Sequence, residues 1–424
     1  MVGLGLVVLL LAGQGCRQDA EAQGQPDTDL NGKVVAGYQG WFAPEGDGAN
    51  LGWFHYGVNH GKFEPGFCTF DMWPDVSEFD ADELYATPFR FADGQVAKVF
   101  SSANRKTVDR HFKWMKDYGV DGAALQRFGS NLRSEKMRDW RDTILAHCRE
   151  AADRHGRLWF IMYDLSGMND ETLETLIISD WKRLIDSGDF RKDTTHATYR
   201  GKPLVSLWGI GFDDNRRYSP SACAKLIDFL KNDPKYGGNA VMGGVPYFWR
   251  EPVQTAKELR KDALPLSEME AVYKQMDILS PWAVSRYADA DEFVATLVKK
   301  DLAWCDANNI GYLPVFFPGF SWHNLEKARH RNAPLNFISR DGGKFLWRQA
   351  VAALQSGARM GYVAMFDEID EGTAIFKVTN NPPVGDSPFA TYEGLPSDHY
   401  LWLTGQIGKL LRNPSAADNE LPKR

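Results

Sequence analysis

Cysteine and metal-binding patterns are scarce in this sequence. It has five cysteines among 424 residues, none in a Cys-x-x-Cys spacing, and its nine histidines include no His-Glu-x-x-His run. Zinc sites and dense disulfide frameworks depend on such spacings, so we expect no metal and no cofactor. Four cysteines follow the amino-terminal segment: Cys68, Cys148, Cys223 and Cys305. We expect the last three of them to be buried free thiols in helices.

Positive charge is also in short supply. The chain has 49 Lys and Arg against 56 Asp and Glu, a net charge of −7. A polyanionic partner is disfavoured by this balance, so we expect no nucleic-acid binding. No short repeat and no low-complexity block interrupts the sequence, and its composition, 43% hydrophobic and 25% charged, is that of a globular chain with a large core, expected here as a monomer.

The amino-terminal segment is apolar but too short to cross a bilayer as a helix. Residues 1–15 carry no charged side chain, which is typical of the hydrophobic part of a secretory signal. Leu11 to Cys16 loosely resembles a bacterial lipoprotein cleavage box. We therefore expect an exported protein, either secreted, periplasmic or at the cell surface, whose only membrane contact is a lipid on Cys16, followed by a polar tether.

Aromatic residues are abundant, at 13% of the chain with 14 Trp. A flat apolar ring packs well on the C–H face of a sugar while the indole N–H finds an acceptor, so this excess favours carbohydrate clefts. A large aromatic core is the alternative for any single Trp.

Eight strand-length apolar runs alternate with helical segments along the chain. Each run is continuously apolar, as expected of strands covered on both faces; the runs are 34–42, 120–128, 158–165, 204–212, 240–249, 278–287, 310–317 and 362–366. One helix has an apolar face with three- and four-residue spacing from Met137 to Ala151, and another ends at Gly119. A final helix follows Ser397 or Asp398 as its N-cap.

This alternation predicts an α/β fold, a single (β/α)8 TIM barrel with a long loop insertion after strand 1. We expect three parts: a signal or lipoprotein-like segment and tether (1–31), a barrel catalytic domain (32–412), and a polar tail (413–424). The insertion, residues 43–106, is too long for a plain connection and carries Trp53, His55, Trp73, Asp75 and Glu78. It predicts a functional loop over the barrel mouth, with a surface subdomain as the alternative.

The last apolar run delivers four acids in five positions, Asp367, Glu368, Asp370 and Glu371, followed by Gly372 and Thr373. Adjacent carboxylates repel one another and lose hydration when buried, so a fold tolerates them chiefly where they do chemistry or bind a cation. Gly372 permits a sharp turn or a close approach of backbone. A solvated acidic turn after an edge strand is the alternative.

The run from Phe366 to Thr373 resembles the Glu-x-x-Glu-Gly-Thr motif of glycoside hydrolase family 99, the endo-α-mannosidases, and of the related family 71 α-glucanases. The family 99 motif usually reads Asn-Glu-Trp-His-Glu-Gly-Thr, and its two glutamates match Glu368 and Glu371, whereas Asp367, Ile369 and Asp370 depart from it. Residues 35–42 and 71–75 are also similar to bacterial family 71/99-like proteins. The resemblance implies a retaining glycosidase of α-mannan or a related polysaccharide, with Glu371 as acid/base and Glu368 as base on the sugar 2-hydroxyl; a direct glutamyl nucleophile stays open.

A barrel places its active site at the carboxyl ends of its strands. Polar and aromatic residues follow the other runs there, including Gln126, Tyr247, Trp282 and Arg286. Beside the catalytic pair Glu368 and Glu371, we predict these substrate-binding residues: Tyr38, Trp41, Arg127, Asp164, Trp208, Trp249, Tyr287, Trp322, His323 and Asp370. A structural ion pair between Asp164 and Arg127 is the alternative for those two.

Three other functions fit parts of the pattern. A carbohydrate-binding barrel needs the aromatics but not the acid pair. A cation site would use the four acids as oxygen ligands, although they lack the spaced turn of a calcium loop. A lyase, or a hydrolase of another glycan on the same fold, would differ in substrate alone.

Overall fold

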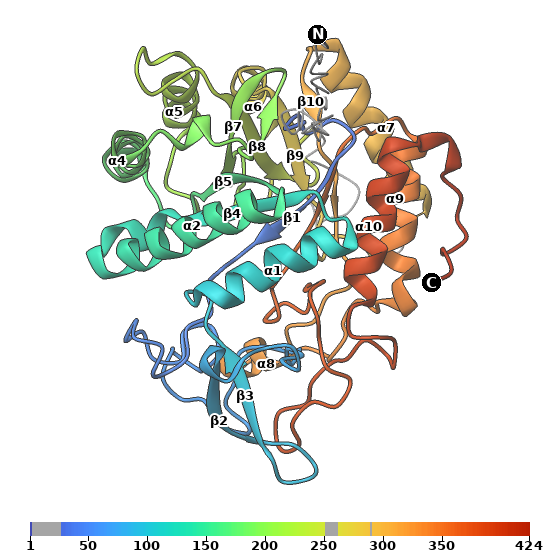
Figure 1. Ribbon diagram of the computed structural model, residues 1–424. Helices are drawn as coiled ribbons and strands as arrows, with labels where there is room; N and C mark the ends of the chain where they lie inside the picture. Colours follow the sequence, from blue (N-terminus) through green and yellow to red (C-terminus); the bar gives the residue numbers. More distant parts are fainter. Residues whose placement is uncertain (2–26, 251–261, 289–290) are drawn as a thin grey trace.

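A computed structural model describes Met1 and residues 27–250, 262–288 and 291–424 (Figure 1). The predicted signal segment and lipid site at Cys16 lie outside the described residues. Within the described part, no helix has the length and apolarity needed to cross a membrane.

A parallel sheet forms the centre of the molecule. Its strands, in chain order, are β1 (Val34–Tyr38), β4 (Gly122–Phe128), β5 (Leu158–Asp164), β7 (Lys202–Trp208), β8 (Ala240–Pro246), β9 (Ile278–Trp282), β10 (Gly311–Tyr312), β11 (Val315–Phe316) and β12 (Gly361–Val363). Their order in the sheet is β10-β9-β8-β7-β5-β4-β1-β12-β11, and the short β6 (Thr198–Tyr199) pairs antiparallel with β7.

One run of chain closes this sheet into a barrel. β10 pairs with β9 and β11 pairs with β12, and only Leu313 and Pro314 separate β10 from β11. The seventh predicted run is therefore a single strand interrupted at a proline, which cannot donate a ladder hydrogen bond. All eight predicted runs supply barrel strands, and the predicted (β/α)8 fold is confirmed.

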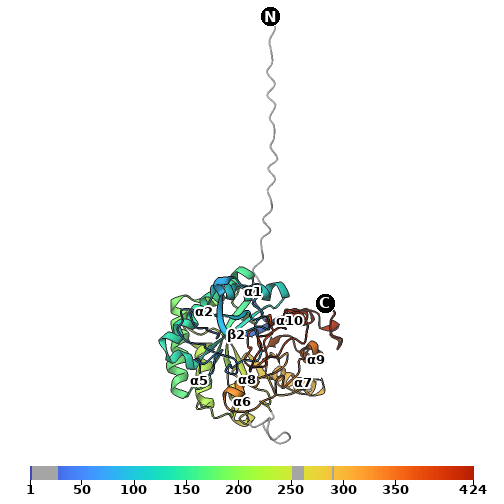
Figure 2. The same ribbon diagram turned by 90° about the horizontal axis from the view of Figure 1, so that it is seen from below.

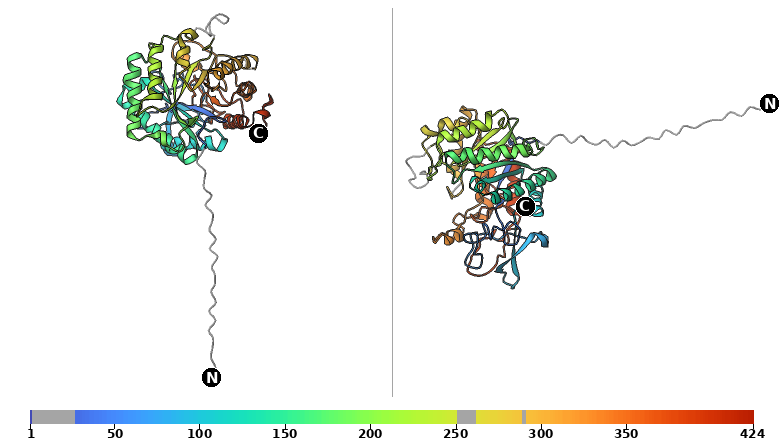
Figure 3. Two further views of the ribbon diagram at one scale, coloured as in Figure 1. Left: turned by 90° about the horizontal axis from the view of Figure 1, so that it is seen from above. Right: turned by 90° about the vertical axis from the view of Figure 1, so that its left-hand side faces the viewer.

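The helices, apart from the short α8 (His323–Ala328) below the sheet, surround the strands, as the views from below and above show (Figures 2 and 3). They are α1 (Arg105–Tyr118), α2 (Glu135–His155), α3 (Asp170–Thr172), α4 (Ser179–Ser187), α5 (Pro220–Asn232), α6 (Leu266–Tyr273), α7 (Asp291–Ala307), α8 (His323–Ala328), α9 (Lys344–Gln355) and α10 (His399–Arg412), with a π-helical turn at Leu173–Ile178. Short 3-10 helices occupy Ala81–Glu83, Gly129–Arg133, Phe190–Lys192, Asp341–Gly343 and Pro414–Ala416.

The predicted helix signals are largely confirmed. Gly119 ends α1 in the left-handed conformation, with φ of 80°. Asp398 occupies the N-cap position of α10 but its side chain makes no cap bond there; it accepts instead from the Tyr118 hydroxyl and from Arg424. The four cysteines beyond the amino-terminal segment are buried free thiols.

The insertion after β1 forms a lobe on the barrel mouth. Its hairpin, β2 (Leu84–Arg90) with β3 (Val96–Phe100), lies below the barrel, as do α8 and the loops before α10 (Figures 1 and 3). Buried Asp71 joins these parts, because its carboxylate accepts from Ser321 Oγ (2.5 Å) and from the backbone amides of His323 (2.6 Å) and Asn324 (2.8 Å). The lobe and the barrel share one continuous hydrophobic core.

The segment after α10 packs against the helices around the barrel. Trp347 Nε1 donates to the Asp418 carbonyl over 3.0 Å, and Arg424 pairs with Asp398. The three-part division of the chain remains a prediction.

Candidate active site

The acidic residues lie in a turn at the carboxyl end of β12, as the barrel rule requires. Asp367, Glu368 and Asp370 are buried, and Glu371 is half-buried. A solvated acidic turn is therefore wrong for this chain, since these side chains have lost most of their contact with water.

Asp367 has a structural role in the turn. Its carboxylate accepts hydrogen bonds from the backbone amides of Gln39 (2.7 Å) and Gly40 (2.9 Å), just past the end of β1. Burial raises the pKa of Asp367 to about 7, although these two hydrogen bonds act to lower it. Asp367 thus fastens the end of β1 to the acidic turn and does not line either of the hollows described next.

Two hollows meet at the other acids. The first, with a volume of about 200 Å³, is lined by Gln39, Trp41, Gln126, Phe128, Asp164, Ser166, Trp208, Trp282, Glu368 and Glu371. The second, about 400 Å³, is lined by Trp41, His55, Gly57, Val58, Asn59, His60, Thr69, Leu325, Ala328, Arg329, Glu368, Asp370 and Glu371. Trp41, Glu368 and Glu371 border both, so the predicted catalytic pair stands at their junction.

The two glutamates hold protons more tightly than free carboxyl groups. Burial raises the pKa of Glu371 to about 7, and the charge of Asp370 adds to the effect. Burial raises the pKa of Glu368 well above its usual value, and the charges of Glu371 and Asp370 raise it further. Near neutral pH the pair can therefore keep one proton while losing the other, which is the state that acid and base catalysis needs.

Backbone hydrogen bonds fix the turn that carries the pair. The Glu368 carbonyl accepts from the amides of Thr373 (3.1 Å) and Ala374 (2.9 Å), and the Glu371 carbonyl accepts from Ser321 (2.8 Å). Gly372 has φ of 62°, and a Cβ there would lie 2.8 Å from Cβ of Ser321. The predicted sharp turn and close approach at Gly372 are both present; the close neighbour is backbone and side chain of Ser321.

The structure brings four of the predicted substrate-binding residues to the hollows. Trp41, Asp164 and Trp208 line the first, and Asp370 and Trp41 line the second. Asp164 accepts from the Ser166 amide (2.7 Å), and burial raises its pKa. The ion pair of Asp164 with Arg127 is not formed.

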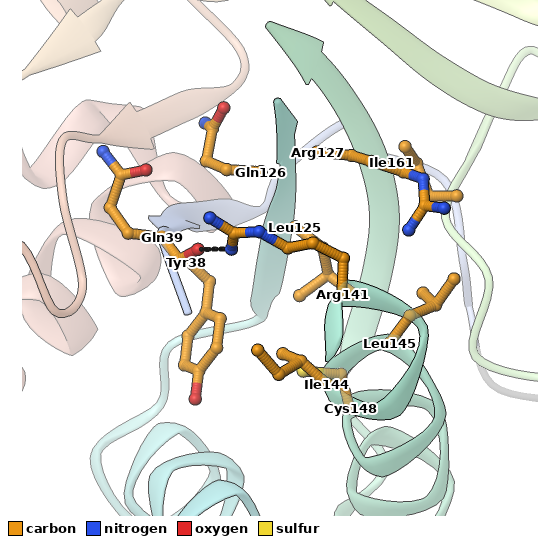
Figure 4. Close-up of a pocket in the computed structure, with 10 residues that line it drawn as sticks. All are labelled: Tyr38, Gln39, Leu125, Gln126, Arg127, Arg141, Ile144, Leu145, Cys148 and Ile161. Carbon is orange, nitrogen blue, oxygen red and sulfur yellow. Dashed lines mark hydrogen bonds between the residues drawn. The ribbon is translucent and has the colours of Figure 1, made fainter. Parts of the chain in front are cut away.

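Tyr38, Arg127 and Trp249 do not fit the prediction, because each is buried away from both hollows. The Tyr38 hydroxyl bonds to His111 Nδ1 (2.9 Å) in α1, and Figure 4 shows its ring pointing away from the side chains of Gln39 and Gln126. Arg127 pairs with Asp180 (2.5 Å) and Asp142 (2.8 Å) in the helix layer.

The remaining three predicted residues do not line the hollows either. The Tyr287 hydroxyl donates to Gln349 Oε1 (2.8 Å). Trp322 packs on Phe320, with ring centroids 5.0 Å apart. His323 Nδ1 lies 2.6 Å from the Ala333 carbonyl.

Strand register explains why Arg127 was misplaced. In the β4–β5 pair Arg127 lies opposite Tyr163, and Phe128 lies opposite Asp164. Successive residues of a strand point to opposite faces, so Arg127 and Tyr163 face the helices while Phe128 and Asp164 face the barrel mouth. Both Arg127 and the Tyr163 hydroxyl accordingly meet Asp180.

Several residues that line the hollows were not among the predicted substrate-binding residues, including Gln39, His55 and Arg329. Gln39 sits in the first apolar run, His55 in the insertion expected over the barrel mouth, and Arg329 in a loop with no neighbouring pattern to single it out. Arg141, also unpredicted, lies behind Gln39 and donates to the carbonyls of Gln39 (2.9 Å) and Gly40 (2.8 Å) (Figure 4). In the described ranges no group of three or more His, Cys, Asp or Glu is arranged to hold a metal ion.

Comparison with known proteins supports the fold. No family model matches the chain, and no curated protein matches its sequence. Two solved structures of the GH99 endo-alpha-mannosidase from Bacteroides thetaiotaomicron, one in complex with BIS-TRIS-propane, superpose with a TM-score of 0.63 at 16% sequence identity, covering 92% of this chain and 100% of that one. This chain therefore shares its fold with these two structures.

Proposed function

We propose that this protein is a glycoside hydrolase that cleaves α-linked glycans, an α-mannan or a related polysaccharide, with retention of configuration. One observation carries the proposal: Glu368 and Glu371 stand together at the junction of two hollows at the barrel mouth. The fold shared with the Bacteroides endo-alpha-mannosidase and the Trp side chains that line the first hollow support it.

The proposed mechanism depends on which of Glu368 and Glu371 carries a proton. Hydrolysis needs one carboxyl group that protonates the leaving oxygen and one ionised group that acts at the sugar. In the proposed mechanism Glu371, the more exposed member, is the acid/base, and Glu368 is the base on the sugar 2-hydroxyl, as the motif resemblance implies. Burial alone favours the opposite location for the resting proton, on Glu368, so the two roles need a direct test.

The arrangement favours cleavage within a chain. A glycan bound across the junction would place sugars in the hollow lined by Trp208 and in the hollow lined by His55. An endo-acting enzyme needs room for the glycan chain on both sides of the scissile bond, and we propose this mode here.

A leaving-group experiment tests the pair. Glu368→Gln and Glu371→Gln retain side-chain size, so each should fold and should lower hydrolysis of α-mannan by several powers of ten. If Glu371 is the acid, an activated aryl or fluoride glycoside should rescue Glu371→Gln alone. Equal rescue of both variants contradicts the assigned roles, and near-normal turnover removes the residue from the mechanism.

A substrate screen tests the reaction itself. The wild type is assayed against α-mannans and α-glucans, with NMR of the first product anomer to read retention or inversion. Binding without cleavage by any of them supports the alternative, a carbohydrate-binding barrel. Activity that survives a chelator argues against a cation site.

We also propose export and lipid attachment at Cys16, supported by the uncharged apolar segment that precedes it. Metabolic labelling with a fatty acid should mark the wild type and not Cys16→Ser. Equal labelling of both contradicts the anchor.

A further inference from the structure

His55 occupies an unusual position between the insertion and the acidic turn. Its Nδ1 lies 3.1 Å from Oδ2 of Asp370. Its ring is stacked on the Trp41 indole, with centroids 3.8 Å apart and planes at 9°. A residue of the insertion is thus placed directly on an acid that borders the second hollow.

The backbone around His55 holds this position. The His55 carbonyl accepts from Thr69 Oγ1 (2.9 Å), and the neighbouring Tyr56 hydroxyl donates to the Phe100 carbonyl (2.8 Å). His55 itself has φ of 62°, in the region that few non-glycine residues adopt. Backbone in such a conformation persists only where its surroundings hold it, so the imidazole is fixed before any ligand arrives.

The outer nitrogen of His55 is available to a ligand. Among the described residues Nε2 has no hydrogen-bond partner, and the side chain remains 23% exposed where it lines the second hollow. Oδ1 of Asp370 is buried and also lacks a partner in the described part of the chain. A satisfied core histidine would have its nitrogens paired, so the pair has unused hydrogen-bonding capacity beside Glu371.

We propose that His55 binds a hydroxyl group of the glycan through Nε2 in the second hollow, and that Asp370 is a positioning residue that fixes the imidazole through Nδ1. This inference rests on the proposed glycosidase function and assigns a substrate contact in the second hollow. Trp41 supplies the surface on which the imidazole lies flat.

The charges of the pair agree with a neutral hydroxyl as ligand. Burial and the positive charge of Arg141 hold the pKa of His55 well below its usual range, so the ring is neutral near pH 7. Burial raises the pKa of Asp370 to about 8, against the opposing charge of Arg329. A protonated Asp370 donates to Nδ1, which leaves the hydrogen of the imidazole on Nε2 as a donor into the hollow.

Two substitutions separate substrate binding from packing. The amide of Gln reaches the place of Nε2, and the amide of Asn reaches that of Nδ1. His55→Gln should therefore have a KM for an α-mannotetraose close to that of the wild type. His55→Asn keeps the Asp370 contact but should raise KM about tenfold, the effect of one lost hydrogen bond. A packing role predicts equal KM in both variants and a lower Tm. That result overturns the inference.

Chemical rescue supplies a second readout. His55→Ala leaves a space beside Trp41 that imidazole can enter, so added imidazole should restore part of kcat/KM. Restoration should be weaker in His55→Ala with Asp370→Ala, because the positioning contact is gone. Rescue that is absent, or independent of Asp370, overturns the inference. As a control, His196 packs on Trp159 in the core (centroids 4.9 Å apart), so His196→Asn should lower Tm without changing KM.

Binding distinguishes failure of this inference from failure of the proposed function. If the wild type cleaves no glycan, calorimetric titration compares the affinities of the wild type and His55→Asn for α-mannotetraose. Weaker binding by His55→Asn supports the contact although the hydrolase proposal has failed. Equal binding by both proteins, or no binding by the wild type, overturns the inference.

Discussion

Nη2 of Arg340 donates to the carbonyl oxygen of Gly372 over 2.6 Å, directly after the catalytic candidate Glu371. The same atom donates to the Ala374 carbonyl over 2.9 Å. The guanidinium is buried between the rings of Tyr392 and Tyr400, 4.9 and 4.6 Å from their centroids, and has no carboxylate partner among the described residues. A buried cation thus holds the turn through its backbone.

Arg340→Met should loosen this turn. The Gly372 carbonyl loses its donor and the Ala374 carbonyl keeps only the Tyr392 hydroxyl (3.0 Å), which should cost about 1–3 kcal/mol of unfolding free energy and lower kcat by displacing Glu371. Arg340→Lys keeps the charge but not the two-carbonyl geometry, so its kcat should lie between those of Arg340→Met and the wild type. Urea denaturation and steady-state kinetics measure both effects. Full activity in Arg340→Met would show that the turn holds without it.

Gly372→Ala should impair catalysis more than stability alone explains. Its left-handed φ costs about 1–2 kcal/mol for any other residue, and the new Cβ would also press on Ser321 at 2.8 Å. Gly94 is a matched control, since it has φ of 85° with nothing within 4 Å of a new Cβ. Gly94→Ala should lose comparable stability yet keep its kcat. Equal kcat in both variants contradicts this account.

Asp370 should make stability depend on pH. Its pKa is raised from 3.8 to about 8 by burial, so between these values the unfolded chain has lost a proton that the folded chain keeps. The unfolding free energy therefore falls as pH rises through this window, by up to about 1.4 kcal/mol per pH unit. Half-buried His55 and buried His111 and His196 have lowered pKa values and act in the opposite direction below about pH 6.5.

Comparison of the wild type with Asp370→Asn isolates this contribution. The variant carries no proton at position 370 to lose, so the stability of the wild type relative to Asp370→Asn should decline from pH 5 to pH 8. Denaturation at several pH values measures the difference. A constant difference would mean that the Asp370 carboxyl titrates alike in the folded and unfolded chain.

The fold could be predicted because its strands are covered on both faces. Continuous apolar runs mark such strands without any knowledge of their partners, and Gly119 marks a helix end by its own backbone requirement. The break between β10 and β11 was not predicted, although Pro314 lies within the run. The acidic turn could be placed because it directly follows its strand.

Side-chain direction at the strand ends could not be predicted in the same way. Asp164 and Arg127 lie at the ends of neighbouring runs. Asp164 faces the barrel mouth and Arg127 faces Asp180, and this difference depends on the register in which the two strands pair. His55 becomes a site residue only when the insertion folds onto Asp370, 315 positions along the chain. No local pattern records a contact of that range.

Two tryptophans at strand ends show this limit and provide a test. Trp208 ends β7, is half-buried and lines the first hollow, with its ring 5.5 Å from that of Trp282. Trp249 follows β8 but is fully buried against Tyr273 and Trp304, with centroids 5.3 and 4.9 Å away. The two look alike in the sequence and differ in what covers them.

Trp208→Ala should weaken substrate binding, whereas Trp249→Ala should weaken the fold. Loss of a sugar-stacking ring should raise KM about tenfold with a small change in Tm. Loss of a buried Trp removes core contacts and leaves a cavity, which should cost about 3–5 kcal/mol of stability while the folded fraction keeps its KM. Thermal unfolding and kinetics on one glycan measure both quantities. A raised KM in Trp249→Ala with an unchanged Tm would return that residue to the substrate site and contradict the assignment of the hollows.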